Sequence, residues 1–211
     1  SGGCAYIWTK DGNTWSESFD LSKSSTNGRY GQSCALSADG RTALISGFKD
    51  TSGGCAYIWT INETDILSEI DLSIEVSANG RYGQSCALSA DGRTALISGF
   101  QGTSGGCAYI WTKEINIWSD EPIEICKNDA NGKFGESCAL STDGNTALIS
   151  GNNNDTSGCA YIWTKDEETG TWSEPFDLSK YATNGKYGHS CSLSGDGKTA
   201  LISGNKWTQG G

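Results

Sequence analysis

The chain has 211 residues, which is enough to bury a substantial hydrophobic core, so its length excludes few folds. Its 29 glycines, 2 prolines, 8 tryptophans and 8 tyrosines are typical of an all-β protein with many tight turns. The formal net charge of -10, without a Lys/Arg cluster, argues against nucleic acid as a partner, and no segment has the ~20 apolar residues that membrane insertion requires.

Near-copies of one unit fill the chain, with a period of about 52 residues. A period of this size indicates a solenoid, a propeller or an array. We treat residues 1–211 as a single repeat domain, because the segment SGGCAYIWT at Ser1 returns with few changes in every unit. The repeat units are residues 1–51, 52–103, 104–156 and 157–211.

The chain opens on a predicted strand, CAYIWT, at residues 4–9, and a turn leads into a second one, TWSESFDL, at residues 14–21. The strands SCALSA and RTALIS follow at residues 33–38 and 41–46. The Asp39-Gly40 pair between them predicts a two-residue type I′ hairpin. We number SCALSA as the first strand of a sheet, RTALIS as the second, the next CAYIWT as the third and the segment after it as the fourth.

The third strand has apolar side chains on both faces, so each sheet needs cover on both sides. Radial packing of four-stranded sheets provides this cover for repeats of this size. The sequence therefore predicts an all-β fold, a β-propeller of four four-stranded blades. The chain begins at a third strand and ends at Gly210-Gly211, just before the next one. We expect either a ring closed by a split blade or part of a longer propeller array.

Several short motifs recur along the chain, among them Tyr30-Gly31, CALSADGRTALISG, GGCAYIWT and a last strand that starts with Trp, except in the second unit, which has Leu67. Together they resemble the FG-GAP-type propeller blades of integrin-like ectodomains and secreted repeat proteins. The Gly-Ala-Pro element of that family is replaced here by Ser46-Gly47-Phe48, and its calcium-loop pattern is missing. The resemblance therefore implies the fold, and no metal site is carried over. The other Tyr-Gly positions hold Tyr82-Gly83, Phe134-Gly135 and Tyr187-Gly188.

Eight of the nine cysteines recur at two positions of the repeat. The first and third strands of one sheet lie ~9–10 Å apart, too far for a relaxed disulfide. Disulfides across adjacent blades and buried thiols both remain open. Without CxxC spacing, metal binding is not expected. These cysteines are Cys4, Cys55, Cys107 and Cys159 on third strands, and Cys34, Cys86, Cys138 and Cys191 on first strands.

The ninth cysteine, Cys126, stands where the other units have Ser22, Ser73 and Ser179. We expect its segment to follow the fourth strand on the outer rim, out of reach of the strand cysteines. Cys126 is therefore predicted to form an intermolecular disulfide, and a drifted surface serine position is the alternative.

Recurring tryptophans of the third strand are candidates for sugar stacking, although packing between blades is the default for such a stripe. The only histidine, His189, stands where other units have Gln32, Gln84 or Glu136. Without a partner in the sequence, we interpret it as a surface residue. No catalytic, phosphate-binding or cofactor motif appears, so we expect neither an enzyme nor a cofactor. The tryptophans are Trp8, Trp59, Trp111 and Trp163.

Two N-glycosylation sequons begin at Asn62 and Asn154, and together with the cysteines they favour an extracellular location, secreted or at the cell surface. The identity of residues 27–48 and 79–100 gives equivalent surfaces that suit regular assembly. We expect a non-enzymatic structural or adhesive module of a fibre or surface assembly, in contact with copies of itself or with surface proteins and glycans. The alternative is a lectin-like, carbohydrate-binding propeller with repeated pockets between blades.

Overall fold

The computed structural model describes residues 2–24, 29–49, 53–74, 81–100, 105–127, 133–152, 157–181 and 186–204. Every regular element in these residues is a β-strand, which confirms the all-β prediction. The sheets of this part of the chain are antiparallel, and none of them closes into a barrel. Within the same residues, no helix has the length and apolar character that crossing a bilayer requires.

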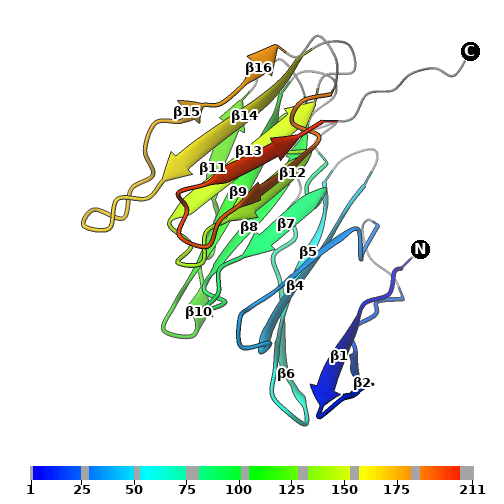
Figure 1. The fold of residues 1–211 in the computed structure, drawn as a ribbon. Coiled ribbons are helices and arrows are strands. Elements are labelled where there is room, and N and C mark those ends of the chain that lie inside the picture. Colours follow the sequence, from blue (N-terminus) through cyan, green and yellow to red (C-terminus); the bar gives the residue numbers. More distant parts are fainter. Residues whose placement is uncertain are drawn as a thin grey trace, which may run out of the picture.

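In three complete sheets the first three strands pair in chain order, and every segment of the fourth strand pairs with the third strand (Figure 1). Sheet I contains β3 (Ser33–Leu36), β4 (Thr42–Phe48), β5 (Gly54–Ile61) and β6 (Ile66–Asp71). Sheet II contains β7 (Ser85–Leu88), β8 (Thr94–Phe100) and β9 (Gly106–Glu114), with β10 (Ile117–Trp118) and β11 (Ile123–Lys127) on its outer edge. Sheet III contains β12 (Ser137–Leu140), β13 (Thr146–Asn152) and β14 (Ser157–Thr164), with β15 (Phe176–Asp177) and β16 (Lys180–Tyr181) on its outer edge.

The complete sheets pack on one another in chain order and form a row. A half-sheet of two strands lies at each end of this row. The N-terminal half-sheet, β1 (Tyr6–Asp11) and β2 (Thr14–Asp20), has the third and fourth strands of a repeat. The C-terminal half-sheet, β17 (Ser190–Leu193) and β18 (Ala200–Ser203), has the first and second strands. Among the described residues these half-sheets do not pair with each other. A fourth complete sheet and its closure through a split sheet are therefore not found in this part of the chain.

One register recurs between the second and third strands of the complete sheets. In sheet I, Leu44 lies opposite Ile58 and Ser46 lies opposite Ala56. The equivalent residues of β8 and β9, and of β13 and β14, pair in the same way. The repeat therefore determines the pairing as well as the strands.

The turn between the first two strands differs from the predicted type I′ hairpin. Gly40 has a φ of 71°, whereas Asp39 is not among the residues with positive φ. Asp39 Oδ1 instead accepts hydrogen bonds from Ser37 Oγ at 2.6 Å and from the Arg41 amide at 2.9 Å. These bonds keep the pKa of Asp39 below its usual value. The type I′ prediction is wrong, because that turn needs positive φ at both central residues.

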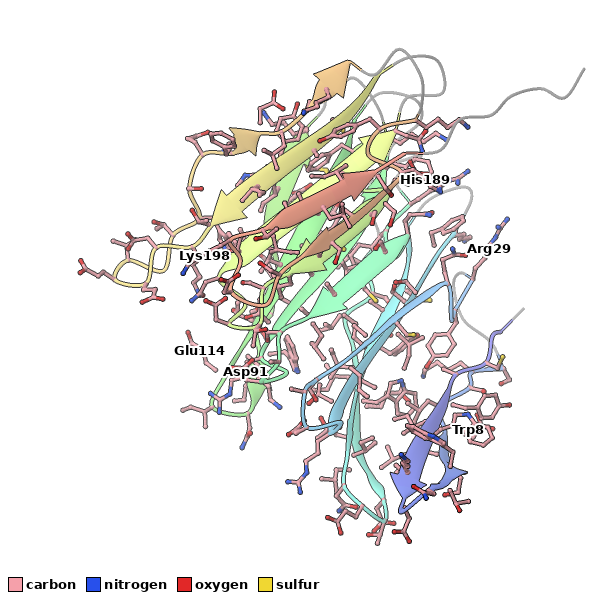
Figure 2. The ribbon with its side chains drawn as sticks, viewed as in Figure 1. Trp8, Arg29, Asp91, Glu114, His189 and Lys198 are labelled. Atoms are coloured by element: carbon pink, nitrogen blue, oxygen red, sulfur yellow. A yellow bond between two sulfur atoms is a disulfide. The ribbon has the colours of Figure 1, made fainter. Side chains whose placement is uncertain are left out.

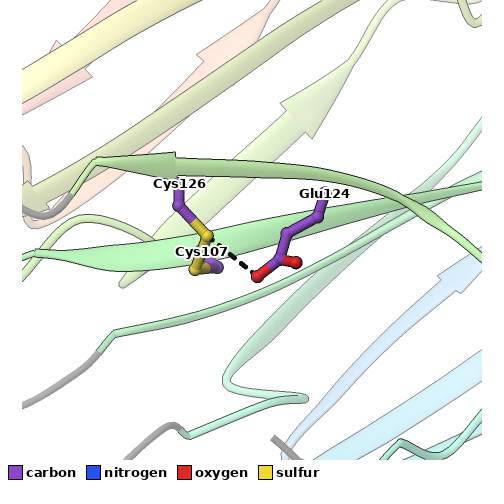
Figure 3. Close-up of side chains that lie close together, drawn as sticks. All are labelled: Cys107, Glu124 and Cys126. Atoms are coloured by element: carbon purple, nitrogen blue, oxygen red, sulfur yellow. Dashed lines mark hydrogen bonds between the residues drawn. A yellow bond between two sulfur atoms is a disulfide. The ribbon is translucent and has the colours of Figure 1, made fainter. Parts of the chain in front are cut away.

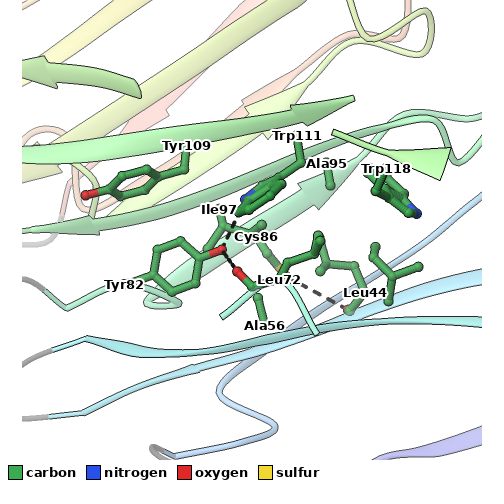
Figure 4. Packing of buried hydrophobic residues seen from close by; sticks show 11 residues of the cluster. Leu44, Ala56, Leu72, Tyr82, Cys86, Ala95, Ile97, Tyr109, Trp111 and Trp118 are labelled. Atoms are coloured by element: carbon green, nitrogen blue, oxygen red, sulfur yellow. Dashed lines mark hydrogen bonds between the residues drawn. The ribbon is translucent and has the colours of Figure 1, made fainter. Parts of the chain in front are cut away.

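Hydrophobic side chains fill the space between successive sheets, so the core consists of layers. One cluster lies between sheets I and II and includes Leu44, Ile58, Ile97 and Trp111 (Figure 4). A second cluster lies between sheets II and III, and a third lies between the N-terminal half-sheet and sheet I. Sheets I and II are therefore covered on both faces, as their two apolar faces require.

A tyrosine that precedes the first strand in the sequence connects neighbouring sheets. The Tyr82 hydroxyl donates a hydrogen bond to the Leu72 carbonyl at 2.6 Å, and it accepts one from Trp111 Nε1 at 3.2 Å. Leu72 follows sheet I, whereas Trp111 lies in sheet II. Tyr30 makes the same two contacts, with Leu21 and Trp59. A buried tyrosine thus satisfies polar groups of two sheets at each of these interfaces.

The first strands of adjacent sheets are also linked by polar contacts. The amide of Cys86 donates to Ser33 Oγ at 3.1 Å, and the amides of Cys138 and Cys191 make the same bond to Ser85 and Ser137. In addition, backbone amides in the turns donate to the carbonyl of the next sheet, from residue 38 to 90, from 90 to 142 and from 142 to 195. These two series of hydrogen bonds hold each sheet in the same position relative to the next one.

We expect Tyr82→Phe to lower the free energy of unfolding by about 1–3 kcal/mol, because Trp111 Nε1 and the Leu72 carbonyl lose their buried partner. Urea denaturation followed by tryptophan fluorescence measures this change. Phe134 occupies the equivalent position in the third unit, so Phe134→Tyr is the matched control and is expected to be neutral or stabilising. An unchanged midpoint for Tyr82→Phe would contradict the role of the hydroxyl.

Candidate functional site

Three of the four candidate sugar-stacking tryptophans are buried between sheets. Trp59, Trp111 and Trp163 are 8%, 5% and 4% exposed, and they pack within the hydrophobic clusters. The prediction of sugar stacking is therefore wrong for these three rings, because no ring face is open to a ligand. Trp8 is 54% exposed, since it lies on the N-terminal half-sheet (Figure 2).

Most recurring cysteines lie at the sheet interfaces and form no disulfide. Cys55, Cys86, Cys138 and Cys159 are buried, and Cys191 is half-buried. Burial raises the pKa of the Cys86 thiol to about 11 and that of Cys138 and Cys159 to about 12. These thiols are therefore protonated and unreactive at neutral pH. Cys4 and Cys34, next to the open N-terminal face, are exposed free thiols.

Cys126 forms a disulfide with Cys107 within sheet II (Figure 3). The fourth strand continues to Lys127, so Cys126 lies inside β11 and directly opposite Cys107 of β9. Their Cα atoms are 4.1 Å apart. The predictions of a rim position and of an intermolecular disulfide are both wrong, because the segment pairs with the third strand.

Glu124 lies beside this disulfide, with Oε1 at 3.0 Å from Cys126 Sγ. The two sulfurs and the carboxylate are close enough to surround one metal ion. Metal ligation requires thiolates, however, and the disulfide removes both of them. The arrangement is therefore a covalent link between neighbouring strands.

Of the two predicted glycosylation sites, Asn62 lies within the described residues and Asn154 does not. Asn62 lies in the exposed turn between β5 and β6, where its Oδ1 accepts hydrogen bonds from the amides of Thr64 and Asp65. Its sequon is accessible there and remains a prediction.

His189 lies at the surface as predicted, but it has two polar partners that the sequence did not indicate. Its Nδ1 lies 3.1 Å from Glu136 Oε1 and 3.3 Å from Asn152 Nδ2. Glu136 Oε2 accepts hydrogen bonds from the Asn152 backbone amide at 3.1 Å and from its side-chain amide. His189 precedes β17, whereas Asn152 ends β13, so the cluster spans the interface between sheet III and the C-terminal half-sheet (Figure 2).

The geometry of this cluster resembles a carboxylate–imidazole pair. A hydrogen bond from Nδ1 to the Glu136 carboxylate would leave Nε2 as the free ring nitrogen. The His189 side chain is 48% exposed, whereas that of Glu136 is 14% exposed. Asn152 is buried, and its Oδ1 has no hydrogen-bond partner among the residues that the structure describes. The cluster therefore offers a reachable base and a buried acceptor.

The sequence carries a signal for this cluster in positions that depart from the repeat. Other units carry Gln32 and Gln84 at the position of Glu136 and His189, and Phe48 and Phe100 at the position of Asn152. The departures from the repeat thus coincide in the third and fourth units. Only the packing of one sheet on the next shows that they touch.

No family model and no curated protein matches this sequence. Among solved structures, the chain is similar to a putative 6-phosphogluconolactonase from Bacteroides uniformis, with a TM-score of 0.51 and 16% identity. The match covers 86% of this chain and 51% of the other, so the chain spans about half the length of that protein. AofleA from Arthrobotrys oligospora also matches, with a TM-score of 0.35 and 9% identity over 92% of this chain and 70% of the other.

The first of these similarities corrects the prediction that the chain is not an enzyme. Its sheets share their fold with a protein named for an enzymatic activity, and the absence of a catalytic motif was the ground of that prediction. An identity of 16% shows the fold alone. The activity therefore belongs to the matched protein, and the fold does not exclude catalysis in this one.

We expect alkylation of the denatured, unreduced chain to label seven of its nine cysteines, because only Cys107 and Cys126 are bonded. The amide of Leu72 donates a hydrogen bond to the Ala56 carbonyl, so Leu72 lies opposite Ala56. The next residue, Ser73, therefore lies opposite Cys55. Ser73→Cys is therefore expected to add a second disulfide and to leave six labelled thiols. Intact mass measures both counts, and labelling of all nine wild-type cysteines would contradict the disulfide.

Proposed function

We propose that this chain is a structural or adhesive module outside the cell, with its sheets arranged as blades of a propeller-like fold of the FG-GAP type. The fold similarity supports the propeller-like arrangement, since the matched structure aligns with 86% of the chain. The meander order of the sheets and their face-to-face packing also fit a row of blades.

The observation that carries this proposal is the use of the repeated side chains. The recurring Tyr, Trp, Ser and Cys residues pack or bond between sheets and thus form a scaffold. In repeat proteins, stability comes largely from such contacts between neighbouring units. The Cys107–Cys126 disulfide supports an oxidising compartment, and the exposed Asn62 sequon is consistent with it.

Cells that produce the chain test this proposal directly. We expect an antibody against the folded chain to label them without permeabilisation, and beads coated with the chain to adhere to these cells. Beads coated with the reduced and unfolded chain are the control. Labelling that appears only after permeabilisation, together with reduced Cys107 and Cys126 in the native material, would contradict an extracellular module.

A second candidate function is hydrolysis at the His189 cluster. The observation that favours it is the 3.1 Å contact between His189 Nδ1 and Glu136 Oε1. A carboxylate that orients an imidazole lets the other ring nitrogen act as a general base toward water. The lactone named in the matched structure is the first substrate to test, since water attack on a lactone carbonyl opens the ring.

If the cluster is catalytic, we expect His189→Gln to lower the hydrolysis rate of 6-phosphogluconolactone by about 100-fold or more, which is the usual contribution of a general base. Gln is the natural residue at this position in the first two units, so the substitution suits the local structure. Gln84→Ala is the matched control and is expected to leave the rate unchanged. A wild-type chain without turnover above the buffer rate would exclude this candidate.

A further inference from the structure

The two half-sheets expose residues that are buried at the same position of every complete sheet. Leu201 is 67% exposed, whereas its equivalents Leu44, Leu96 and Leu148 are fully buried. Trp8 shows the same contrast with the three buried tryptophans. Each half-sheet therefore has an exposed apolar face. A four-stranded sheet like the complete ones would require the pair of strands that the other half-sheet contains.

A cavity lies at the N-terminal end, between the N-terminal half-sheet and sheet I. It has a volume of about 380 Å³, and its lining includes Tyr6 and Trp8 of β1, together with Cys34, Leu36 and Ile45 of sheet I. At the next interface, β3 and β4 of sheet I pack on β7 of sheet II. In the same way, a first and a second strand of a preceding sheet would pack on β3. The described residues contain no such strands there. The cavity has the position that these two strands would cover.

We propose that the C-terminal half-sheet of one copy of this chain docks head to tail on the N-terminal half-sheet of a second copy. The joint sheet would run β17, β18, β1 and β2, with β1 and β2 from the second copy. This proposal rests on the propeller-like row of the proposed function, which it extends from one chain to two. The occupant is a second copy because β17 and β18 are a first and a second strand, the two that the open face lacks among the described residues.

The internal sheets define the register of this contact. Because Leu44 lies opposite Ile58 and Ser46 opposite Ala56, Leu201 would lie opposite Ile7 of the second copy, and Ser203 opposite Ala5. The series of hydrogen bonds between first strands would also continue. The Cys34 amide of the second copy would reach Ser190 Oγ, as the Cys86 amide reaches Ser33 Oγ at 3.1 Å.

A head-to-tail contact of this kind is heterologous, so it produces either a closed ring or a filament. Each copy contributes three complete sheets and two half-sheets, so two copies joined at both ends contain eight sheets. Closed propellers have roughly four to eight blades, which makes a two-copy ring the expected product. Each copy carries a net charge of -10, and salt screens the repulsion between copies. We therefore expect docking to strengthen as ionic strength rises.

Light scattering after size-exclusion chromatography measures the mass of the assembly. We expect the 211-residue chain to change from 22.3 kDa to twice that mass as its concentration increases. Leu201→Asp is expected to weaken dimerisation at least tenfold, because it places a carboxylate on the docking face. Ile117→Asp is the matched control, since Ile117 is 75% exposed on β10 at the outer edge of sheet II, which lies between two complete sheets and is not part of the docking face. Circular dichroism confirms that both variants are folded.

Cysteine cross-linking tests the register. A chain with Ser203→Cys, mixed with a chain with Ala5→Cys, is expected to give an interchain disulfide that joins the two introduced residues. Ser203→Cys mixed with Ile7→Cys is the shifted control, in which the residues are not opposite each other. Peptide mass spectrometry separates these products from those of the native thiols.

A monomer at all concentrations, or equal cross-linking in the matched and shifted pairs, would overturn the docking. A mass that grows without limit supports the head-to-tail contact and overturns the two-copy ring. An equal loss of dimer in Leu201→Asp and Ile117→Asp would contradict the proposed face. None of these results depends on where the chain is located, so failed docking can be distinguished from failure of the extracellular, adhesive role.

Discussion

The contact between one sheet and the next is the constraint on which the rest of the structure depends. A third strand with apolar side chains on both faces is stable only when another sheet covers each face. The repeat meets this need with Tyr, Trp and Leu residues, whose polar groups bond across the interface. It also allows close approach: a Cβ atom on Gly99 would lie only 2.0 Å from the Arg81 carbonyl oxygen. The second strand therefore carries glycine where the segment before the first strand crosses it.

This constraint explains the cysteines and tryptophans, which had several interpretations at the level of the sequence. Inside the row, both residue types fill space between sheets, and burial makes the thiols unreactive. At the N-terminal end, where the covering strands are absent from the described residues, Trp8, Cys4 and Cys34 are exposed. One residue type thus has different environments that follow from its place in the row, although the local sequence is almost the same.

Departures from the repeat are where this scaffold acquires individual features. Cys126 replaces a serine whose hydroxyl accepts a hydrogen bond from the third strand in other units, as Ser73 does from Ala56, and it forms a covalent link to that strand instead. Glu136, Asn152 and His189 replace glutamine and phenylalanine and make a polar cluster between sheets. Since such changes leave the repeated contacts intact, they can supply chemistry at low cost to the fold.

The sequence by itself determined the strands, their meander order and the unit length, because these depend on side-chain alternation and turn residues that are neighbours along the chain. It did not determine the type of the Asp39-Gly40 turn, since the side-chain bonds of Asp39 compete with the backbone preference for type I′. Tertiary structure alone decided the partner of Cys126, because the pairing depends on how far β11 extends along β9. It also decided the partners of His189, since Glu136 and Asn152 belong to another sheet. Contacts between sheets join residues about one repeat apart, and the alternation within one strand carries no information about them.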